Sequence, residues 1–441
     1  EEHILMPAWL NGDLDLFKVN VNTGAHERIA IGTGNTYAWF VDKQGEPTFR
    51  MNVNDRRTVV TIYTRESREN GKIKWRKTRK IRLKRERKEA ENQLEFRPLS
   101  PGPTDNTYYI TTRPAGEENE GVYLYDFEKD EILEAVKTEP GVDVNRALFD
   151  RDTGDYMGVY YFRDRLTFEM EDEETQKHLD ALNVYFDNAA NVYPVDSSEK
   201  GKKWLIYADG PTQPGTYHVY DVERTHARYI GTSRNSLTGK QLAKTDIIKY
   251  TARDGLEITG YLTRPARALK ADQPPLLMMP HGGPEARDYI EYNHQVQFLA
   301  SLGYQVFQPN FRGSSGYGKS FADKGRRQYG KAMQTDIEDG LMHLVETGLV
   351  DPERVCIIGY SYGGYAALAG ATLTPDLYKC VIAGAGPSDL VKMLKWERKE
   401  EGRNSESYQY WVEQIGDPKL DKDALMTVSP AHLADRVTSP V

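Results

Sequence analysis

Ser361 stands in a sequence pattern that is typical of a nucleophilic serine. The motif Gly359-Tyr360-Ser361-Tyr362-Gly363 reads G-x-S-x-G, and it lies between the apolar run 355–358 and the small-residue stretch 364–368. A strand, a sharp turn and a helix in that order form a nucleophile elbow. The turn leaves no room for side chains at Gly359 and Gly363. We expect Ser361 to be the nucleophile of an acyl transfer rather than an incidental serine in a glycine-rich turn.

A second candidate group is the motif His281-Gly282-Gly283-Pro284, which follows the apolar run 276–280. Glycine lets a backbone N–H approach a substrate closely, so this loop can supply one donor to a developing oxyanion. The other expected donor is the backbone N–H of Tyr362. Of the two glycines we favour Gly283. We expect His281 to brace the loop, because in α/β-hydrolases the catalytic base follows the serine.

The base and its orienting acid have no convincing candidates. His432 is the only histidine after Ser361, and it precedes the place where the last strand would begin. The aspartates in this region look like turn or helix-start residues: Asp376, Asp389 and Asp417. We therefore expect the triad Asp and His to lie beyond Val441.

The second half of the chain, from residue 239, alternates between strand and helix patterns. The predicted strands are residues 247–250, 258–262, 276–279, 304–308, 355–358 and 380–382. The predicted helices are residues 295–302, 333–347 and 365–371. This alternation is typical of a mostly parallel, doubly wound sheet. We assign residues 239–441 to an α/β-hydrolase domain, which is incomplete because it lacks the region of the Asp and His.

The first half reads as all-β, with short apolar runs at residues 108–112, 122–127, 157–162 and 204–207 between turn residues. Three stretches resemble one another, because in each a strand pattern runs into Asn20, Asp126 or Asp221 and then a polar turn. These positions are 106 and 95 residues apart, about two propeller blades each at roughly 40–50 residues per blade. We assign residues 1–238 to an incomplete β-propeller of about five blades.

Two charged stretches lie in this first half. Residues 72–88 hold 11 Lys or Arg among 17 residues. Their apolar residues keep the period of a strand: Ile73, Trp75, Ile81 and Leu83. We interpret the stretch as a charged edge strand, with a nucleic-acid patch as the alternative. Residues 169–174 (EMEDEE) are interpreted as the first turn of a helix through Leu182, with a carboxylate cluster for a peptide amine as the alternative.

Composition narrows the function classes. The net charge of -8 argues against a general nucleic-acid binder, and no apolar run is long enough to span a membrane. Cys356 and Cys380 are too few for a disulfide framework, and both lie in apolar runs where buried thiols are usual. The chain begins at Glu1 rather than Met and ends where a strand would start. We therefore expect a fragment that is truncated at both ends.

Together these motifs resemble the prolyl oligopeptidase family of serine peptidases, and most closely its acylaminoacyl-peptidase branch. The resemblance covers the hydrolase half and rests on Arg253-Asp254-Gly255, the H-G-G-P loop, residues 310–318 (NFRGSSGYG), residues 351–354 (DPER) and residues 361–365 (SYGGY). It implies a β-propeller that gates access to short peptide substrates. It also implies an acyl-enzyme on Ser361, an Asp and a His that follow the strand beginning at Val441, and no metal or organic cofactor.

Two other functions stay open. An esterase or lipase uses the same G-x-S-x-G motif, although such enzymes usually lack a propeller. A propeller binding module with a degenerate hydrolase domain is the non-enzymatic alternative. The sequence does not decide between exopeptidase and endopeptidase action, between a cytoplasmic and a periplasmic location, or between a monomer and a homo-oligomer.

Overall fold

The structure is a computed structural model, and it describes residues 2–55, 59–69, 72–82, 97–104, 106–150, 153–198, 201–237, 242–265 and 273–441. The chain forms two compact units. Unit 1 consists of Glu1–Pro140, Ala147–Met157 and Trp396–Trp411. Unit 2 consists of Gly141–Arg146, Gly158–Lys395 and Val412–Val441.

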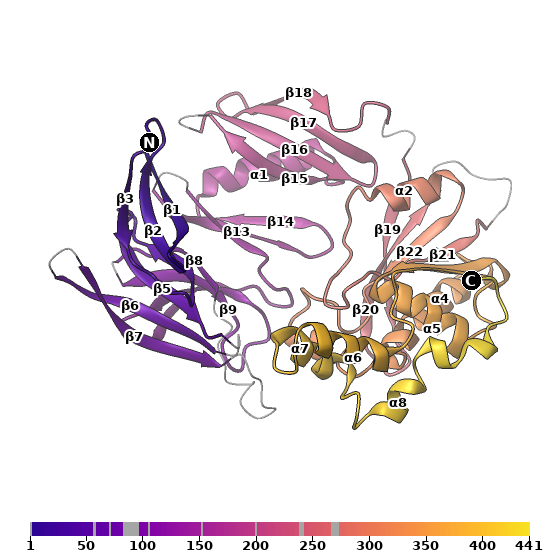
Figure 1. The fold of residues 1–441 in the computed structure, drawn as a ribbon. Coiled ribbons are helices and arrows are strands. Elements are labelled where there is room, and N and C mark those ends of the chain that lie inside the picture. The colour runs from indigo at the N-terminus through magenta and orange to yellow at the C-terminus, as the bar shows by residue number, and fades with distance from the viewer. Residues whose placement is uncertain are drawn as a thin grey trace. The chain divides into compact units, whose positions relative to one another are not determined.

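In the described residues, the first eighteen strands form five sheets in which consecutive strands are neighbours (Figure 1). The first sheet contains β1 (His3–Leu10), β2 (Asp13–Asn20) and β3 (His26–Ala30). The second contains β4 (Thr36–Val41), β5 (Pro47–Val53), β6 (Val59–Glu69) and β7 (Lys72–Arg82). The third contains β8 (Arg97–Pro101), β9 (Thr107–Thr112), β10 (Gly121–Asp126) and β11 (Glu131–Lys137). The fourth contains β12 (Arg146–Phe149), β13 (Tyr156–Phe162) and β14 (Leu166–Met170). The fifth contains β15 (Asn191–Ser197), β16 (Lys203–Gly210), β17 (Gln213–Asp221) and β18 (His226–Thr232).

The three repeat markers occupy equivalent places in alternate sheets. Asn20, Asp126 and Asp221 end β2, β10 and β17, each of which precedes the last strand of the first, third or fifth sheet. In each turn the marker side chain accepts backbone N–H bonds, from residues 22 and 23, from residues 128 and 129, and from residue 224. An Asn or Asp recurs there because its side chain satisfies the N–H groups of the turn. The predicted repeat therefore has a structural basis in small antiparallel sheets of the propeller type.

The described parts of both charged stretches lie mainly in strands and a helix. Strand β7 is the edge of its sheet, with Trp75 half-buried and Lys74 and Lys77 exposed, as predicted. Leu83 and the rest of the basic stretch lie outside the described residues. Helix α1 (Glu173–Tyr185) begins after the N-cap Asp172, with two glutamates in its first turn. The helix was predicted to start earlier, but residues 169 and 170 end β14.

The remaining strands form one mixed sheet in the order β19-β20-β22-β21-β23-β24. Strands β19 (Lys244–Thr251) and β20 (Glu257–Arg264) form the predicted hairpin, and β20 is antiparallel to β22 (Gln305–Pro309). Strands β21 (Leu276–Met278), β22, β23 (Val355–Tyr360) and β24 (Cys380–Gly384) are parallel. The buried strands are continuous apolar runs because helices cover such sheets on both faces.

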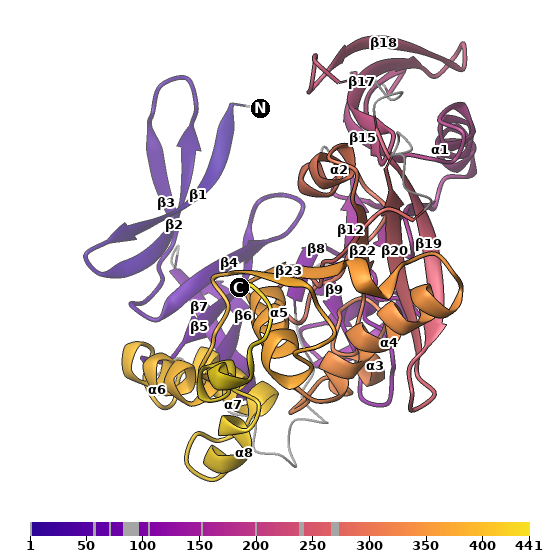
Figure 2. The ribbon, with the colours of Figure 1, turned by 90° about the vertical axis from the view of Figure 1, so that its right-hand side faces the viewer.

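The helices of this region are α2 (His294–Ser301), α3 (Lys319–Asp323), α4 (Ala332–Glu346), α5 (Tyr362–Leu373), α6 (Leu390–Glu400), α7 (Glu406–Ile415) and α8 (Lys422–Met426), with short 3-10 turns at Pro352–Arg354, Pro430–His432 and Ala434–Arg436. Helix α5 packs on β23 and β24, α2 on β20 and β22, and α4 on β19 (Figure 2). On α4 the buried face includes Ile337, Leu341 and Leu344, as the periodicity predicted. The chain thus combines propeller-type sheets with an α/β-hydrolase fold, as predicted.

The two cysteines differ from expectation. We predicted buried thiols, but Cys356 and Cys380 are directly opposite in the parallel pair β23–β24 and form a disulfide, with Cα atoms 4.8 Å apart. Their side chains are also only half-buried. The two cysteines meet because of the register in which β23 and β24 pair, and this register cannot be seen in the sequence.

Two further expectations from the sequence concern membrane-spanning segments and the place of the domain boundary. None of the helices in the described residues is both long and apolar enough to cross a bilayer. The predicted domain boundary near residue 238 falls on residues that the structure does not describe, so it stays a prediction.

Candidate active site

Ser361 lies in the turn between β23 and α5, where its backbone has φ 58° and ψ −121°. Positive φ is uncommon for a residue with a side chain and costs about 1–3 kcal/mol, so the surroundings must hold it. They do so from both sides, because Ser361 N–H donates to the carbonyl of Gly384 at 2.9 Å and its own carbonyl accepts from Tyr365 N–H at 3.0 Å. This is the strained strand-to-helix geometry of a nucleophile elbow.

The two motif glycines have the steric role that the sequence suggested. A Cβ atom at Gly359 would lie 2.1 Å from the carbonyl oxygen of Gly363. A Cβ atom at Gly363 would lie 2.2 Å from the carbonyl oxygen of Pro280. Both contacts are with backbone atoms, which cannot rotate away as a side chain would. The glycines therefore allow the elbow to close and to sit directly against the start of the H-G-G-P loop.

The H-G-G-P loop lies beside Ser361. A Cβ atom placed on Gly282 would be 3.5 Å from Cβ of Ser361 and 4.0 Å from its Oγ. Gly283 has φ +119°, a conformation that only glycine adopts readily. The structure thus brings together Ser361, Tyr362 at the first position of α5, and the two loop glycines. The loop backbone at Gly282 is therefore close to the Ser361 side chain, and the N–H of Tyr362 follows Ser361 directly in the chain.

His281 braces this loop. Its Nδ1 lies 2.7 Å from the Gly282 carbonyl oxygen, and its Nε2 lies 2.9 Å from Oγ of Ser314. The ring stacks on Phe311, with the centroids 4.4 Å apart. Burial lowers the pKa of His281 to about 4, so the imidazole is neutral near pH 7. Since both ring nitrogens have partners in the loop region, this geometry supports the bracing role.

His432, the histidine that follows Ser361, is paired with Asp389. Its Nε2 lies 3.1 Å from Oδ2 of Asp389, while Oδ1 of the same carboxylate accepts the N–H of Lys392 at 3.0 Å. Asp389 therefore caps the first turn of α6, which matches its predicted place as a helix-start residue. Asp417 likewise accepts turn N–H groups, from residues 419 and 420.

An ion network that joins the buried Arg312 and Asp336 to the more exposed Asp254 was not anticipated from the sequence. The guanidinium of Arg312 donates to both oxygens of Asp336, at 2.7 and 2.8 Å, and to Asp254 at 2.7 Å. Hydrogen bonds to Asp336 and then Asp254 raise the pKa of Arg312 against its burial. These residues join the N-F-R-G-S segment, α4 and the β19–β20 hairpin. Arg312 and Asp254 both lie in motifs that carry the family resemblance. Their pairing with each other and with Asp336 could not be predicted, because the three residues lie far apart in the chain.

Comparison with known proteins gives a family match for the C-terminal part of the chain. Residues 290–441 match the model described as the prolyl oligopeptidase family. This region belongs to that family. Gly282 and Gly283 lie a few residues before the match, and Ser361 lies inside it.

The curated relatives that match the chain carry the names of peptidases. It is 32% identical over 316 residues to dipeptidyl aminopeptidase BIII of Pseudoxanthomonas mexicana, which covers 68% of this chain and 44% of the relative. It is 29% identical over 268 residues to dipeptidyl peptidase family member 6 of Caenorhabditis elegans, covering 54% and 35%. An acylamino-acid-releasing enzyme of Arabidopsis thaliana is 32% identical over 123 residues, covering 27% and 16%. The chain thus spans less than half the length of these relatives.

Solved structures share the whole fold. A puromycin-hydrolyzing peptidase of Mycobacterium tuberculosis superposes with a TM-score of 0.71 at 19% identity, covering all of this chain and 66% of the other. The acylaminoacyl peptidase of Pyrococcus horikoshii gives a TM-score of 0.60 at 17% identity, covering 100% and 76%. At this identity the likeness establishes the fold alone.

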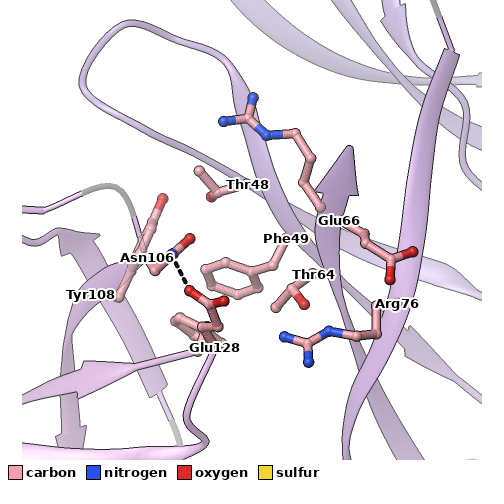
Figure 3. Close-up of a pocket in the computed structure, with 10 residues that line it drawn as sticks. Thr48, Phe49, Thr64, Glu66, Arg76, Asn106, Tyr108 and Glu128 are labelled. Carbon is pink, nitrogen blue, oxygen red and sulfur yellow. Dashed lines mark hydrogen bonds between the residues drawn. The ribbon is translucent and has the colours of Figure 1, made fainter. Parts of the chain in front are cut away.

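Unit 1 contains a separate pocket of about 290 Å³ between its second and third sheets (Figure 3). Three of its lining residues are buried aromatics (Phe49, Tyr108 and Phe127), and Asn106 donates to Glu128 at 2.7 Å. The lining residues are Thr48, Phe49, Thr64, Arg65, Glu66, Arg76, Asn106, Tyr108, Phe127 and Glu128. This lining contains no histidine or cysteine. Across the described part of the chain, no cluster of His, Cys, Asp and Glu has the geometry to hold a metal ion.

Proposed function

We propose that the chain is part of a serine peptidase that hydrolyses peptide bonds of short peptides through an acyl-enzyme on Ser361. The observation that carries the proposal is the strained elbow at Ser361 with the Gly282-Gly283 loop against its side chain. Membership of residues 290–441 in the prolyl oligopeptidase family supports peptides as the substrates.

The proposed chemistry follows from the donors around the nucleophile. Ser361 Oγ attacks the peptide carbonyl carbon while a base removes its proton. The N–H groups of Tyr362 and Gly283 stabilise the oxyanion of the tetrahedral intermediate. The base then protonates the leaving amine, and a water molecule hydrolyses the acyl-enzyme by the same route. None of these steps uses a metal or an organic cofactor.

The base and its acid are proposed to come from sequence that follows Val441. His281 and His432 each have partners elsewhere, in the H-G-G-P loop and at the start of α6. The curated relatives are more than twice as long as the part that this chain matches. A longer form of the protein is therefore the right material for activity assays.

The five small sheets are proposed to act as a propeller that limits access to the active site, with the domain boundary near residue 238. A narrow entrance would admit oligopeptides and exclude folded proteins. The fold of the solved relatives supports this arrangement. A longer form that cleaved a folded protein as fast as an oligopeptide would contradict the gating proposal.

The decisive experiment compares wild type with Ser361→Ala in the longer form. We expect the variant to turn over an aminoacyl-anilide at least about 10⁴-fold more slowly, and a fluorophosphonate probe to label Ser361 in the wild type only. Faster turnover of p-nitrophenyl esters with no anilide cleavage would favour an esterase. An unlabelled, inactive wild type would favour a propeller binding module.

A further inference from the structure

Arg287 links the loop that follows H-G-G-P to a turn of the fourth sheet. Its guanidinium donates to the carbonyl oxygen of Phe162 at 2.9 Å and also to that of Arg163. It lies 4.1 Å above the ring of Tyr317 and donates to the Tyr317 hydroxyl at 3.0 Å. All of these residues belong to unit 2. The fork of the guanidinium thus joins three chain segments at once.

The turn between β13 and β14 is held by the same loop at further points. Ile290 N–H donates to the Asp164 carbonyl oxygen at 2.9 Å, and the rings of Tyr289 and Phe162 are 4.1 Å apart. The hydroxyl of Tyr261, on β20, donates to the Asp164 carboxylate at 3.2 Å. Three backbone carbonyls of the turn, the Ile290 N–H and the side chains of Arg287 and Tyr289 therefore fix the loop against this turn.

The other end of the loop reaches the candidate oxyanion hole. Arg287 is four residues after Gly283, and between them Ala286 N–H donates to the Pro284 carbonyl at 2.7 Å. The Ala286 carbonyl accepts from Ser315 N–H at 2.9 Å. Because the stretch from Gly283 to Arg287 is short and restrained by these hydrogen bonds, the guanidinium and the Gly283 N–H cannot move independently of each other. Displacement of Arg287 would therefore move Gly283.

We propose that Arg287 is a positioning residue for the oxyanion hole: by holding the carbonyls of Phe162 and Arg163, it sets the place of the Gly283 N–H relative to Ser361. The inference rests on the function proposed above. It makes the β13–β14 turn a working part of the active site although it supplies no reacting group. Since an error of about 1 Å in catalytic geometry can cost roughly 100-fold in rate, the expected effect is large.

The first test needs no activity and uses the 441-residue chain itself. Hydrogen–deuterium exchange is followed in peptides covering residues 281–289 for wild type, Arg287→Gln and Arg354→Gln. Arg354 is the matched control, because it also donates to a backbone carbonyl, that of Gln273 at 2.9 Å, which lies outside the loop. We expect exchange in this segment to be at least about fivefold faster in Arg287→Gln and unchanged in Arg354→Gln. Equal rates in all three proteins would overturn the proposal.

The second test measures kcat and KM separately in the longer form. For Arg287→Gln we expect kcat to fall about 10- to 100-fold with KM within about twofold, since an oxyanion donor acts on the transition state. A peptide aldehyde, whose hemiacetal oxygen occupies the oxyanion hole, should bind more weakly in the same proportion. Arg287→Lys keeps the positive charge but lacks the planar guanidinium, so its kcat should lie between those of the wild type and Arg287→Gln. It replaces Arg287→Gln if that variant does not fold.

The outcomes separate this inference from the proposed function. If Ser361→Ala is inactive while both Arg287 variants keep the wild-type kcat and aldehyde affinity, the positioning role is wrong and the peptidase function stands. If Ser361→Ala keeps its activity, the proposed function itself fails. A rise in KM with kcat unchanged would also overturn the positioning role, because it would place Arg287 in substrate binding.

Discussion

Nε2 of His432 lies 3.1 Å from Oδ2 of Asp389, at the first turn of α6. A histidine paired with an aspartate downstream of a nucleophilic serine looks at first like the remainder of a catalytic triad. The other oxygen of Asp389, however, accepts the Lys392 N–H, so the carboxylate works as a helix cap. We therefore expect this pair to support the fold and not the reaction.

Asp389→Ala should destabilise the protein by about 1–2 kcal/mol, the usual cost of removing an N-cap. His432→Gln should cost less, and anilide turnover by the longer form should stay within about twofold of the wild type. Urea denaturation and anilide turnover measure the two effects. If His432→Gln instead slowed turnover by about two orders of magnitude or more, this histidine would be identified as the base.

The same pair has a pH signature. Burial raises the pKa of Asp389, but the Lys392 N–H and the nearby His432 outweigh it, so the pKa lies below its ordinary value. The folded protein then binds this proton less readily than the unfolded chain does. The stabilising contribution is complete above about pH 4 and is lost as the pH falls further. Asp389→Asn should remove this part of the acid dependence.

Gly363→Ala should be strongly destabilising, by about 2–4 kcal/mol, because the new Cβ would lie 2.2 Å from the Pro280 carbonyl oxygen. Gly231→Ala is the matched control, since a Cβ at Gly231 meets nothing within 4 Å. That variant should change the free energy of unfolding by less than about 1 kcal/mol. Similar losses in both variants would refute the steric explanation of the elbow glycines.

The Cys356–Cys380 disulfide should make stability depend on reductant. The bond closes a loop with a sequence separation of 24 residues, for which the chain-entropy relation gives about 3.5 kcal/mol. Thermal melting with and without dithiothreitol should differ in wild type and coincide in the Cys356→Ala/Cys380→Ala variant. Two thiols that react with maleimide in unfolded, unreduced protein would contradict the disulfide.

His281 should make the protein sensitive to mild acid. Burial lowers its pKa to about 4, against about 6.5 in an unfolded chain. Its contribution is complete above about pH 6.5 and shrinks as the pH falls toward 4, which amounts to about 2 kcal/mol between pH 7.5 and pH 5. Urea denaturation at these two pH values should show this difference in wild type and in His294→Gln, an exposed control, but less of it in His281→Gln.

Local patterns explain why much of the fold could be predicted. The signals for the strand before Ser361 and for the helix after it lie in consecutive residues. The same holds for the hairpin between β19 and β20, which Asp254-Gly255 marks. The marker residues Asn20, Asp126 and Asp221 bond to N–H groups two or three positions away. Each of these signals acts within one turn or one strand, so a single sequence contains it.

The unpredicted features all depend on long-range register. Cys356 and Cys380 meet only because β23 and β24 pair with those residues opposite each other. Arg287 reaches carbonyls 124 and 125 positions earlier in the chain, and backbone carbonyls leave no mark in a sequence. Arg312 finds Asp254 and Asp336 on two different elements. In each case the residue type indicates what kind of group it can bond to, but only the tertiary fold determines which residue supplies that group.

The backbone of Ser361, at φ 58°, sets stability and activity against each other at one position. Glycine adopts this conformation freely, so Ser361→Gly should melt at a higher temperature than the wild type while losing its nucleophile. A screen that selects only for thermal resistance would therefore enrich an inactive protein. Any effort to make a more robust form has to keep this residue fixed and seek its gains elsewhere in the chain.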